Sequence, residues 1–179
     1  MSRFVQIPGY YRAKMQFIGL TKGVYTVTDE DLFFTTDGTE GGVFLSKLDE
    51  LGELRMTNGF LGMPSEILVR SGMSIKFSIV FFDEYKARII TIIFGAVLIF
   101  FLGFFGAIAG IIPLGIVLII NSRAIKESSR QFSNAVAHKL AVKPGGDPIV
   151  VGIIYIVIGV IALLIGSTLF LLRVISLLS

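Results

Sequence analysis

The sequence contains no cysteine, and its single histidine is His138. Without cysteine the chain can form no disulfide, thiolate nucleophile, thiolate-ligated zinc site or iron–sulfur cluster. A lone histidine on the polar side of a predicted helix is far more often a surface residue than a metal ligand or a general base. We therefore expect no metal centre, no cofactor and no enzymatic activity.

Charged residues are scarce as well. They make up 16% of the sequence, against about 25% in ordinary soluble proteins, and none lies in residues 89–120 or 149–172. Hydrophobic residues make up 54%. The net charge of +3 is explained by lysines and arginines beside these two stretches better than by nucleic-acid binding. The composition predicts an integral membrane protein with membrane lipids as partners and no nucleic-acid partner.

Residues 1–82 are predicted to form a soluble β domain. Residues 1–10 lack the apolar run of a signal peptide, and from residue 11 short alternating or apolar runs are separated by turn residues, which is typical of antiparallel strands. Seven strands are expected, at residues 12–20, 23–28, 31–36, 42–46, 53–57, 66–70 and 74–81. The carboxylates Asp29, Glu30 and Asp31 fall on a turn, where local capping explains them.

Residues 83–121 are predicted to be a helix that closes the β domain and continues into a membrane hairpin. As one straight helix, residues 89–120 would be about 48 Å long, against a hydrocarbon core of about 30 Å. A hairpin or a partly penetrating, re-entrant wedge fits better than a single crossing, with a reversal near residues 106–110, where glycines relax the backbone. Both flanks of the run are basic, which places both ends, the β domain and the linker on the cytoplasmic side.

Residues 122–148 are predicted to be a basic linker whose residues 123–142 form an amphipathic helix. Ile125, Ser129, Phe132, Val136 and Leu140 share one side of this helix, whereas Arg123, Lys126 and Arg130 lie on the other. Such a helix either lies in the headgroup layer of the membrane or is a solvated connector packed on the β domain. The candidate contacts to lipid headgroups are Lys22, Arg123, Lys126, Arg130 and Lys139.

Residues 149–179 are predicted to be a transmembrane helix, because the charge-free run 149–172 has the length of one crossing. Gly152, Gly159 and Gly166 recur every seven residues with Ala162 between them, which leaves one stripe without bulk. Such a stripe allows close helix packing, either against the hairpin of the same chain or against a second copy.

Three runs resemble the pleckstrin-homology (PH) superfold in its GRAM or bacterial PH version. They are GLTKGVYTVTDEDLFF from Gly19, VFLSKLDEL from Val43 and SGMSIKFSIV from Ser71. The resemblance implies a seven-stranded β barrel closed by one C-terminal helix, which binds lipid headgroups or protein partners without catalysis. Phosphoinositide-binding members carry several basic residues between the first two strands, where this chain has only Lys22.

These patterns predict membrane α + β architecture and two functional hypotheses. The first is a non-enzymatic, membrane-anchored PH/GRAM-like module that binds a protein partner or a lipid at the cytoplasmic membrane face. The second is a small accessory subunit of a larger membrane complex, in which the hairpin and the glycine stripe contact other subunits. Either hypothesis implies a protein partner or a homo-oligomer.

Overall fold

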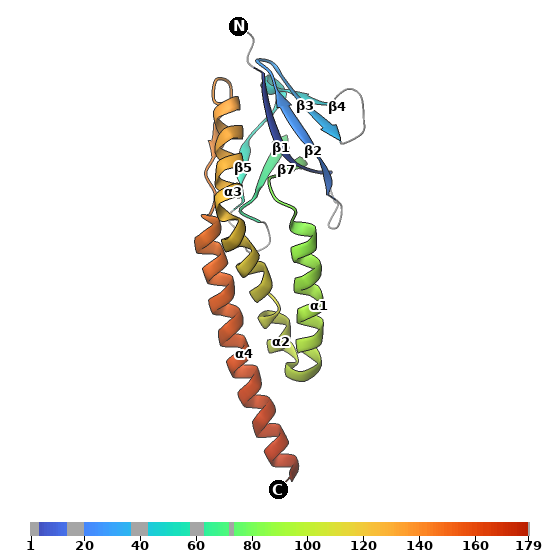
Figure 1. Cartoon of the computed structure of the whole chain (residues 1–179), viewed down its shortest axis with the longest axis vertical. Coiled ribbons are helices and arrows are strands. Elements are labelled where there is room, and N and C mark those ends of the chain that lie inside the picture. The colour runs from blue at the N-terminus through green and yellow to red at the C-terminus, as the bar shows by residue number, and fades with distance from the viewer. Residues whose placement is uncertain (1–3, 14–19, 37–42, 58–62, 72–73, 179) are drawn as a thin grey trace. The chain divides into compact units, whose positions relative to one another are not determined.

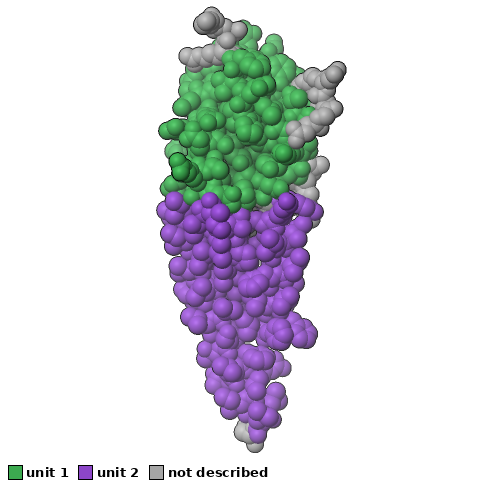
Figure 2. Space-filling model, in the orientation of Figure 1, with its two compact units in different colours: residues 1–83, 121–148 green, residues 84–120, 149–179 purple. Residues whose placement is uncertain are grey.

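The structure, a computed structural model, describes residues 4–13, 20–36, 43–57, 63–71 and 74–178. The chain divides into two compact units, which Figure 2 distinguishes by colour. Residues 1–83 and 121–148 make up the β unit, and residues 84–120 and 149–179 make up the helical unit. Each unit is therefore built from two separate stretches of the chain.

The β unit contains one open sheet in the order β4-β3-β2-β1-β7-β6-β5-β8 (Figure 1). Its strands are β1 (Val5–Ala13), β2 (Thr21–Val27), β3 (Asp31–Thr36), β4 (Val43–Lys47), β5 (Leu54–Met56), β6 (Glu66–Ser71), β7 (Ser74–Val80) and β8 (Val142–Lys143), with a short 3-10 helix at Leu48–Glu50. Neighbours among the first seven strands are antiparallel, whereas β8 runs parallel to β5. The expectation of seven antiparallel strands is wrong, because a sheet edge recruits a distant eighth strand. The sheet also has two edges, so the expected barrel is not formed.

Strands β2 to β7 lie close to their predicted positions, but β1 begins upstream of the predicted strand at residues 12–20. Pro8 and Gly9 obscured the β1 pattern because both are rare inside strands. The structure explains the glycine: a Cβ on Gly9 would lie 2.9 Å from Cε2 of Tyr25. Residues 14–19, in the rest of the predicted strand, lie outside the described residues.

The linker is helical for a shorter distance than predicted. Helix α3 (Ile112–Val136) ends before the expected residue 142, and Val142 and Lys143 instead form β8. Val142 pairs with Leu54 and Lys143 with Arg55. Backbone pairing with an exposed strand edge favours an extended conformation over continued helix.

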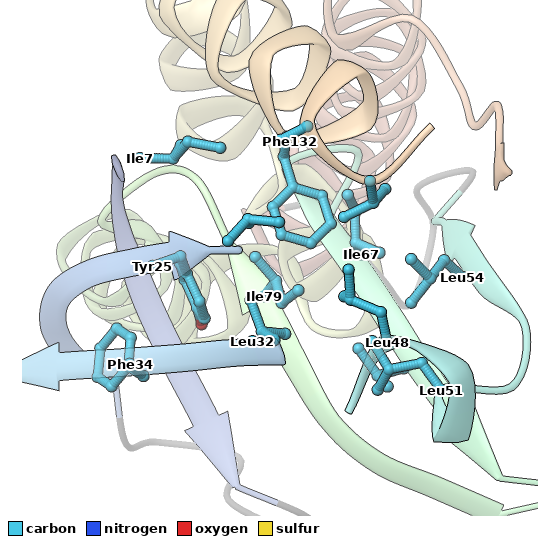
Figure 3. Close-up of a cluster of buried hydrophobic side chains, with 14 of the residues drawn as sticks. Ile7, Tyr25, Leu32, Phe34, Leu48, Leu51, Leu54, Ile67, Ile79 and Phe132 are labelled. Carbon is cyan, nitrogen blue, oxygen red and sulfur yellow. The ribbon is translucent and has the colours of Figure 1, made fainter. Parts of the chain in front are cut away.

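The core of the β unit lies between the sheet and the last turns of α3 (Figure 3). Phe132 is fully buried and contacts the rings of Tyr25 and Phe81, at centroid distances of 6.4 and 5.9 Å. Other core side chains come from the strands and the segment after β4, among them Ile7, Leu32, Leu48, Leu51, Leu54, Ile67 and Ile79. The predicted linker helix therefore packs on the sheet.

Tyr25 combines burial with a hydrogen bond: its hydroxyl donates to the backbone carbonyl of Tyr10 at 2.7 Å. Burial, and to a smaller extent the neighbouring Tyr11, raises the pKa of the Tyr25 hydroxyl well above its usual value. The folded state therefore holds this proton more tightly than the unfolded state. The resulting stabilisation is present below the unfolded pKa of about 10 and is lost as pH rises from there towards the folded pKa.

Replacing Tyr25 by phenylalanine is expected to cost about 1 kcal/mol of stability at pH 7, because one hydrogen bond is lost. The variant should also lose less stability than the wild type when pH rises above about 10. Urea unfolding of the full chain in detergent, followed by circular dichroism at both pH values, measures both effects. Parallel pH dependence of the two proteins would contradict the assignment to Tyr25.

The helical unit contains α1 (Glu84–Leu102), α2 (Phe104–Ala109), the first part of α3 and α4 (Pro148–Leu178). Among the residues that the structure describes, three helical segments are long and apolar enough to cross a membrane: Tyr85–Leu102, Phe104–Val136 and Pro148–Leu178. The architecture is thus an N-terminal β-sheet followed by helices of membrane-spanning length and composition.

The chain reverses between α1 and α2 at Gly103 and not at the predicted residues 106–110. Gly103 has φ +57°, a left-handed conformation that glycine adopts without strain. Gly106 serves a different purpose, because a side chain there would collide with the backbone of Leu98, and one on Gly110 would lie 2.7 Å from the Cα of Gly95. Glycine occurs both where the chain turns and where two helices pack closely, so the glycines of this run do not by themselves show where the chain reverses.

Candidate functional site

The exposed face of α3 carries three of the predicted headgroup-binding residues. Arg123, Lys126 and Arg130 are exposed, whereas Ile125 and Phe132 are fully buried. This separation follows from the 3.6-residue period of the helix, which places residues three and four apart on one side. Phe132 packs in the core of the β unit. The linker helix is therefore packed on the β domain, as one of its two interpretations predicts.

Carboxylates accompany most of these basic side chains. Lys126 Nζ lies 2.7 Å from Asp147 Oδ2, Arg130 pairs with Glu127 at 3.3 Å, and Lys139 Nζ lies 2.9 Å from Asp49 Oδ2. No carboxylate among the described residues pairs with Arg123. The positive charge of Arg123 is therefore the least neutralised among the basic residues of the linker. The sequence alone does not distinguish Arg123 from Lys126, Arg130 and Lys139 in this respect.

Two ion pairs, Lys139–Asp49 and Lys143–Glu53, connect elements that are far apart in the sequence. The hydrogen bond to Asp49 raises the pKa of Lys139, and the hydrogen bond from Lys143 lowers the pKa of Glu53. Both shifts favour the charged forms of Lys139 and Glu53. They attach the segment after α3 to the 3-10 helix and to the strand β5 region of the β unit.

Lys22, the fifth candidate, lies on a different element from the other four. It occupies the start of β2, opposite Tyr10 of β1, and is exposed. Burial and the charge of Asp83 raise the pKa of the Tyr10 hydroxyl, and the positive charge of Lys22 partly opposes them. Lys22 therefore lies on the sheet and does not belong to the basic face of α3.

His138 has a structural environment that sequence reasoning missed. Its Nδ1 lies 3.0 Å from the carbonyl oxygen of Ala135, and its Nε2 lies 3.0 Å from that of Asp29. The ring therefore lies between the end of α3 and the turn that joins β2 and β3, with a backbone carbonyl close to each nitrogen. At that turn, the Thr28 hydroxyl accepts the backbone N–H of Asp31 at 2.9 Å.

Within the described ranges, no group of three metal-ligating side chains is brought together. Asp29 and Glu30 occupy the turn after β2 and Asp31 begins β3, and the Thr28 hydroxyl also accepts the N–H of Glu30. This local bonding is the capping that turn residues commonly provide.

The glycine stripe of α4 lies against the hairpin within the helical unit. A Cβ on Gly152 would be 2.7 Å from the carbonyl oxygen of Gly115, one on Gly159 would collide with Ile112, and one on Gly166 would be 2.9 Å from the Cβ of Phe105. Ala162 is also buried. The missing side chains allow α4 to approach the returning helices closely along its length.

Replacing Gly152 by valine is expected to destabilise the helical unit by about 1–3 kcal/mol, because the added methyl groups overpack the interface with Gly115 and Ile119. Ala96→Val adds bulk at an exposed position of α1 and is the matched control. Thermal denaturation in detergent, read as loss of monodisperse protein, compares the two variants. If Gly152→Val altered only the oligomeric state and left the melting temperature at the control value, the stripe would serve association between copies.

The geometry defines a class of protein: a β-sheet unit joined to helices long and apolar enough to cross a membrane, with basic residues following the apolar part of α3. No protein-family model matches the chain, and no curated protein sequence matches it.

Proposed function

We propose that the chain is a non-enzymatic, membrane-anchored PH/GRAM-like module that binds a lipid headgroup or a protein partner at the cytoplasmic membrane face. One observation carries the proposal: α3 begins in the apolar helical unit and later supplies Phe132 and Val136 to the core of the β unit. The same helix exposes Arg123 and Arg130. A domain that shares a core helix with its own anchor is suited to recognition beside the bilayer.

The strand arrangement supports the PH/GRAM-like part of the proposal. Strands β1 to β7 pair antiparallel in the order β4-β3-β2-β1-β7-β6-β5, and a helix packs on their apolar face. The antiparallel pairing of these strands and the packed helix support the resemblance, whereas the open edges of the sheet and the parallel strand β8 depart from it. A further departure is that helices α1 and α2 and the first part of α3 separate strand β7 from the packed residues of α3.

The charges beside the apolar helices support a cytoplasmic position for the β unit. Lys86 and Arg88 precede the apolar part of α1, and Arg123 and Lys126 follow the apolar part of α3. Lysine and arginine close to membrane spans favour the cytoplasmic side. Each basic residue near an anionic surface contributes about 1 kcal/mol to lipid attraction, and Arg123 should contribute most because no described carboxylate pairs with it.

The test is native mass spectrometry of the full chain purified in mild detergent from membranes that contain anionic phospholipid. The proposal predicts a monomer or homo-oligomer that retains anionic phospholipid, and less retained lipid in the Arg123→Gln/Arg130→Gln variant. Lys47→Gln/Lys76→Gln removes the same charge from exposed positions on the sheet and should leave lipid retention unchanged. Equal retention in both variants would refute a headgroup contact at α3.

A second candidate function is an accessory subunit of a larger membrane complex. It is favoured by α1, whose apolar side chains Ile90, Ile92, Ile93, Val97 and Phe100 are all exposed. Stoichiometric co-purification of other chains in the same experiment, lost on substitution of these residues by smaller ones, would favour this candidate over the first.

A further inference from the structure

The tip of the hairpin between α1 and α2 is entirely apolar. Three phenylalanines surround it with high exposure: Phe100 at 84%, Phe101 at 54% and Phe104 at 75%. No polar side chain occurs between Ile92 and Ile120. A turn that emerged into water would expose these rings to solvent at a substantial free-energy cost, whereas acyl chains would cover them favourably.

The backbone of the turn is bonded internally. The N–H of Gly103 donates to the carbonyl of Ile99 at 2.8 Å, and the carbonyl of Gly103 accepts the N–H groups of Gly106 and Ala107 at 3.0 and 3.4 Å. Backbone groups in hydrocarbon need partners of this kind because no water is there to replace them. The turn therefore has the chemistry of a membrane interior.

Helix α1 reaches membrane-spanning length only when the charged residues at its start are included. The charge-free part of α1, residues 89–102, is about 21 Å long at about 1.5 Å per residue, against about 30 Å for the hydrocarbon core. A crossing by this arm would require charged residues at its start, such as Arg88, to enter the hydrocarbon.

Helix α4 measures the depth of the turn independently, because it lies antiparallel to the returning helices of the same unit. Gly152 lies against Gly115, and Gly166 lies against Leu102 and Phe105 at the tip. Figure 1 shows α4 continuing beyond the turn. Arg173 is about 10 Å further along α4 than Gly166, and the side chains between them include the exposed and apolar Leu169, Phe170, Leu171 and Leu172.

We infer that the α1–α2 hairpin is re-entrant: its phenylalanine tip ends among the acyl chains of the far leaflet, and only α4 crosses the bilayer. Arg173 then marks the far interface, where its guanidinium reaches the headgroups. Both arms of the hairpin return to the side of the β unit. This topology does not depend on the ligand of the proposed recognition module.

The absence of tryptophan from the sequence allows a direct test. The full chain carrying Phe104→Trp is reconstituted into phosphatidylcholine vesicles whose acyl chains are brominated either near the headgroup or near the terminal methyl. The exposed position accommodates the larger ring, and Tyr85→Trp, at the start of α1, is the shallow control. Phe101→Trp gives a second tip position if the first variant fails to reconstitute.

We expect greater loss of Phe104→Trp emission with the deep bromines than with the shallow ones, the reverse order for Tyr85→Trp, and no quenching of the tip by aqueous iodide. Strongest quenching of the tip by shallow bromines or by iodide would overturn the inference, because it would place the turn at an interface. Iodide added inside or outside the vesicles then distinguishes a hairpin that crosses from one that never inserts.

Discussion

Replacing Phe132 by alanine is expected to lower the free energy of unfolding of the β unit by about 3–5 kcal/mol. The side chain is fully buried, and its ring contacts Tyr25 and Phe81 from the opposite side of the core. Removing it leaves a cavity between α3 and the sheet that rigid strands cannot close. Alanine has high helix propensity, so the loss would report packing and not the helix itself.

Pulse proteolysis of the full chain in increasing urea measures this effect, because cleavage reports the fraction of open protein. Phe100→Ala is the matched control, since it removes the same side chain from a position that is 84% exposed. We expect the control to leave the urea midpoint of the β unit unchanged. A Phe132→Ala midpoint equal to the control would mean that α3 is not packed on the sheet in solution.

Replacing Glu66 by glutamine is expected to cost about 3 kcal/mol, because it removes the negative charge from a buried ion pair. Arg12 Nη1 lies 3.0 Å from Glu66 Oε1, and the two side chains are only 13% and 5% exposed. Arg12 belongs to β1 and Glu66 to β6, on either side of β7. The pair therefore connects β1 and β6, the two neighbours of β7 in the sheet.

The size of this effect is judged against an exposed pair and a paired replacement. Glu53→Gln breaks the exposed contact between Glu53 and Lys143 at 2.8 Å and should have a much smaller effect, because solvent screens such pairs. The double variant Arg12→Met/Glu66→Leu removes both charges and should recover most of the stability lost in the single variant. Urea unfolding midpoints of the wild type and the three variants measure these differences. If Glu66→Gln lowered the midpoint no more than Glu53→Gln, water would reach the pair of Arg12 and Glu66.

Sequence patterns predict some strands of the sheet well and others poorly. Strand β3 follows its predicted residues, because Leu32 and Phe34 alternate with less buried neighbours and the Thr28 turn marks its start. Strand β1 was misplaced, because Pro8 and Gly9 interrupt the pattern that identifies strands. Strand β8 could not be predicted, because two residues carry no periodicity and its partner β5 is distant in the chain.

For the candidate headgroup-binding residues, too, the sequence predicts some features and not others. Sequence spacing correctly placed Arg123, Lys126 and Arg130 on one exposed face of a helix. It could not reveal that Lys126 pairs with Asp147 or Lys139 with Asp49, because such contacts depend on how separate elements meet. The charge that remains for a ligand is therefore a property of the folded chain.

The sequence by itself determined that apolar helices would be present, because long runs without charge cannot form a solvated surface. It also determined that strands would precede these helices, because alternation and turn residues are local signals. Only the tertiary structure decided which helix covers the sheet. An amphipathic period shows that one face of α3 is buried but not what buries it, and the structure shows Phe132 of α3 packing among strands that lie far away in the sequence. The same reason separates Gly103 from Gly106: both are glycine in the sequence, but one provides a left-handed turn and the other a close contact between helices.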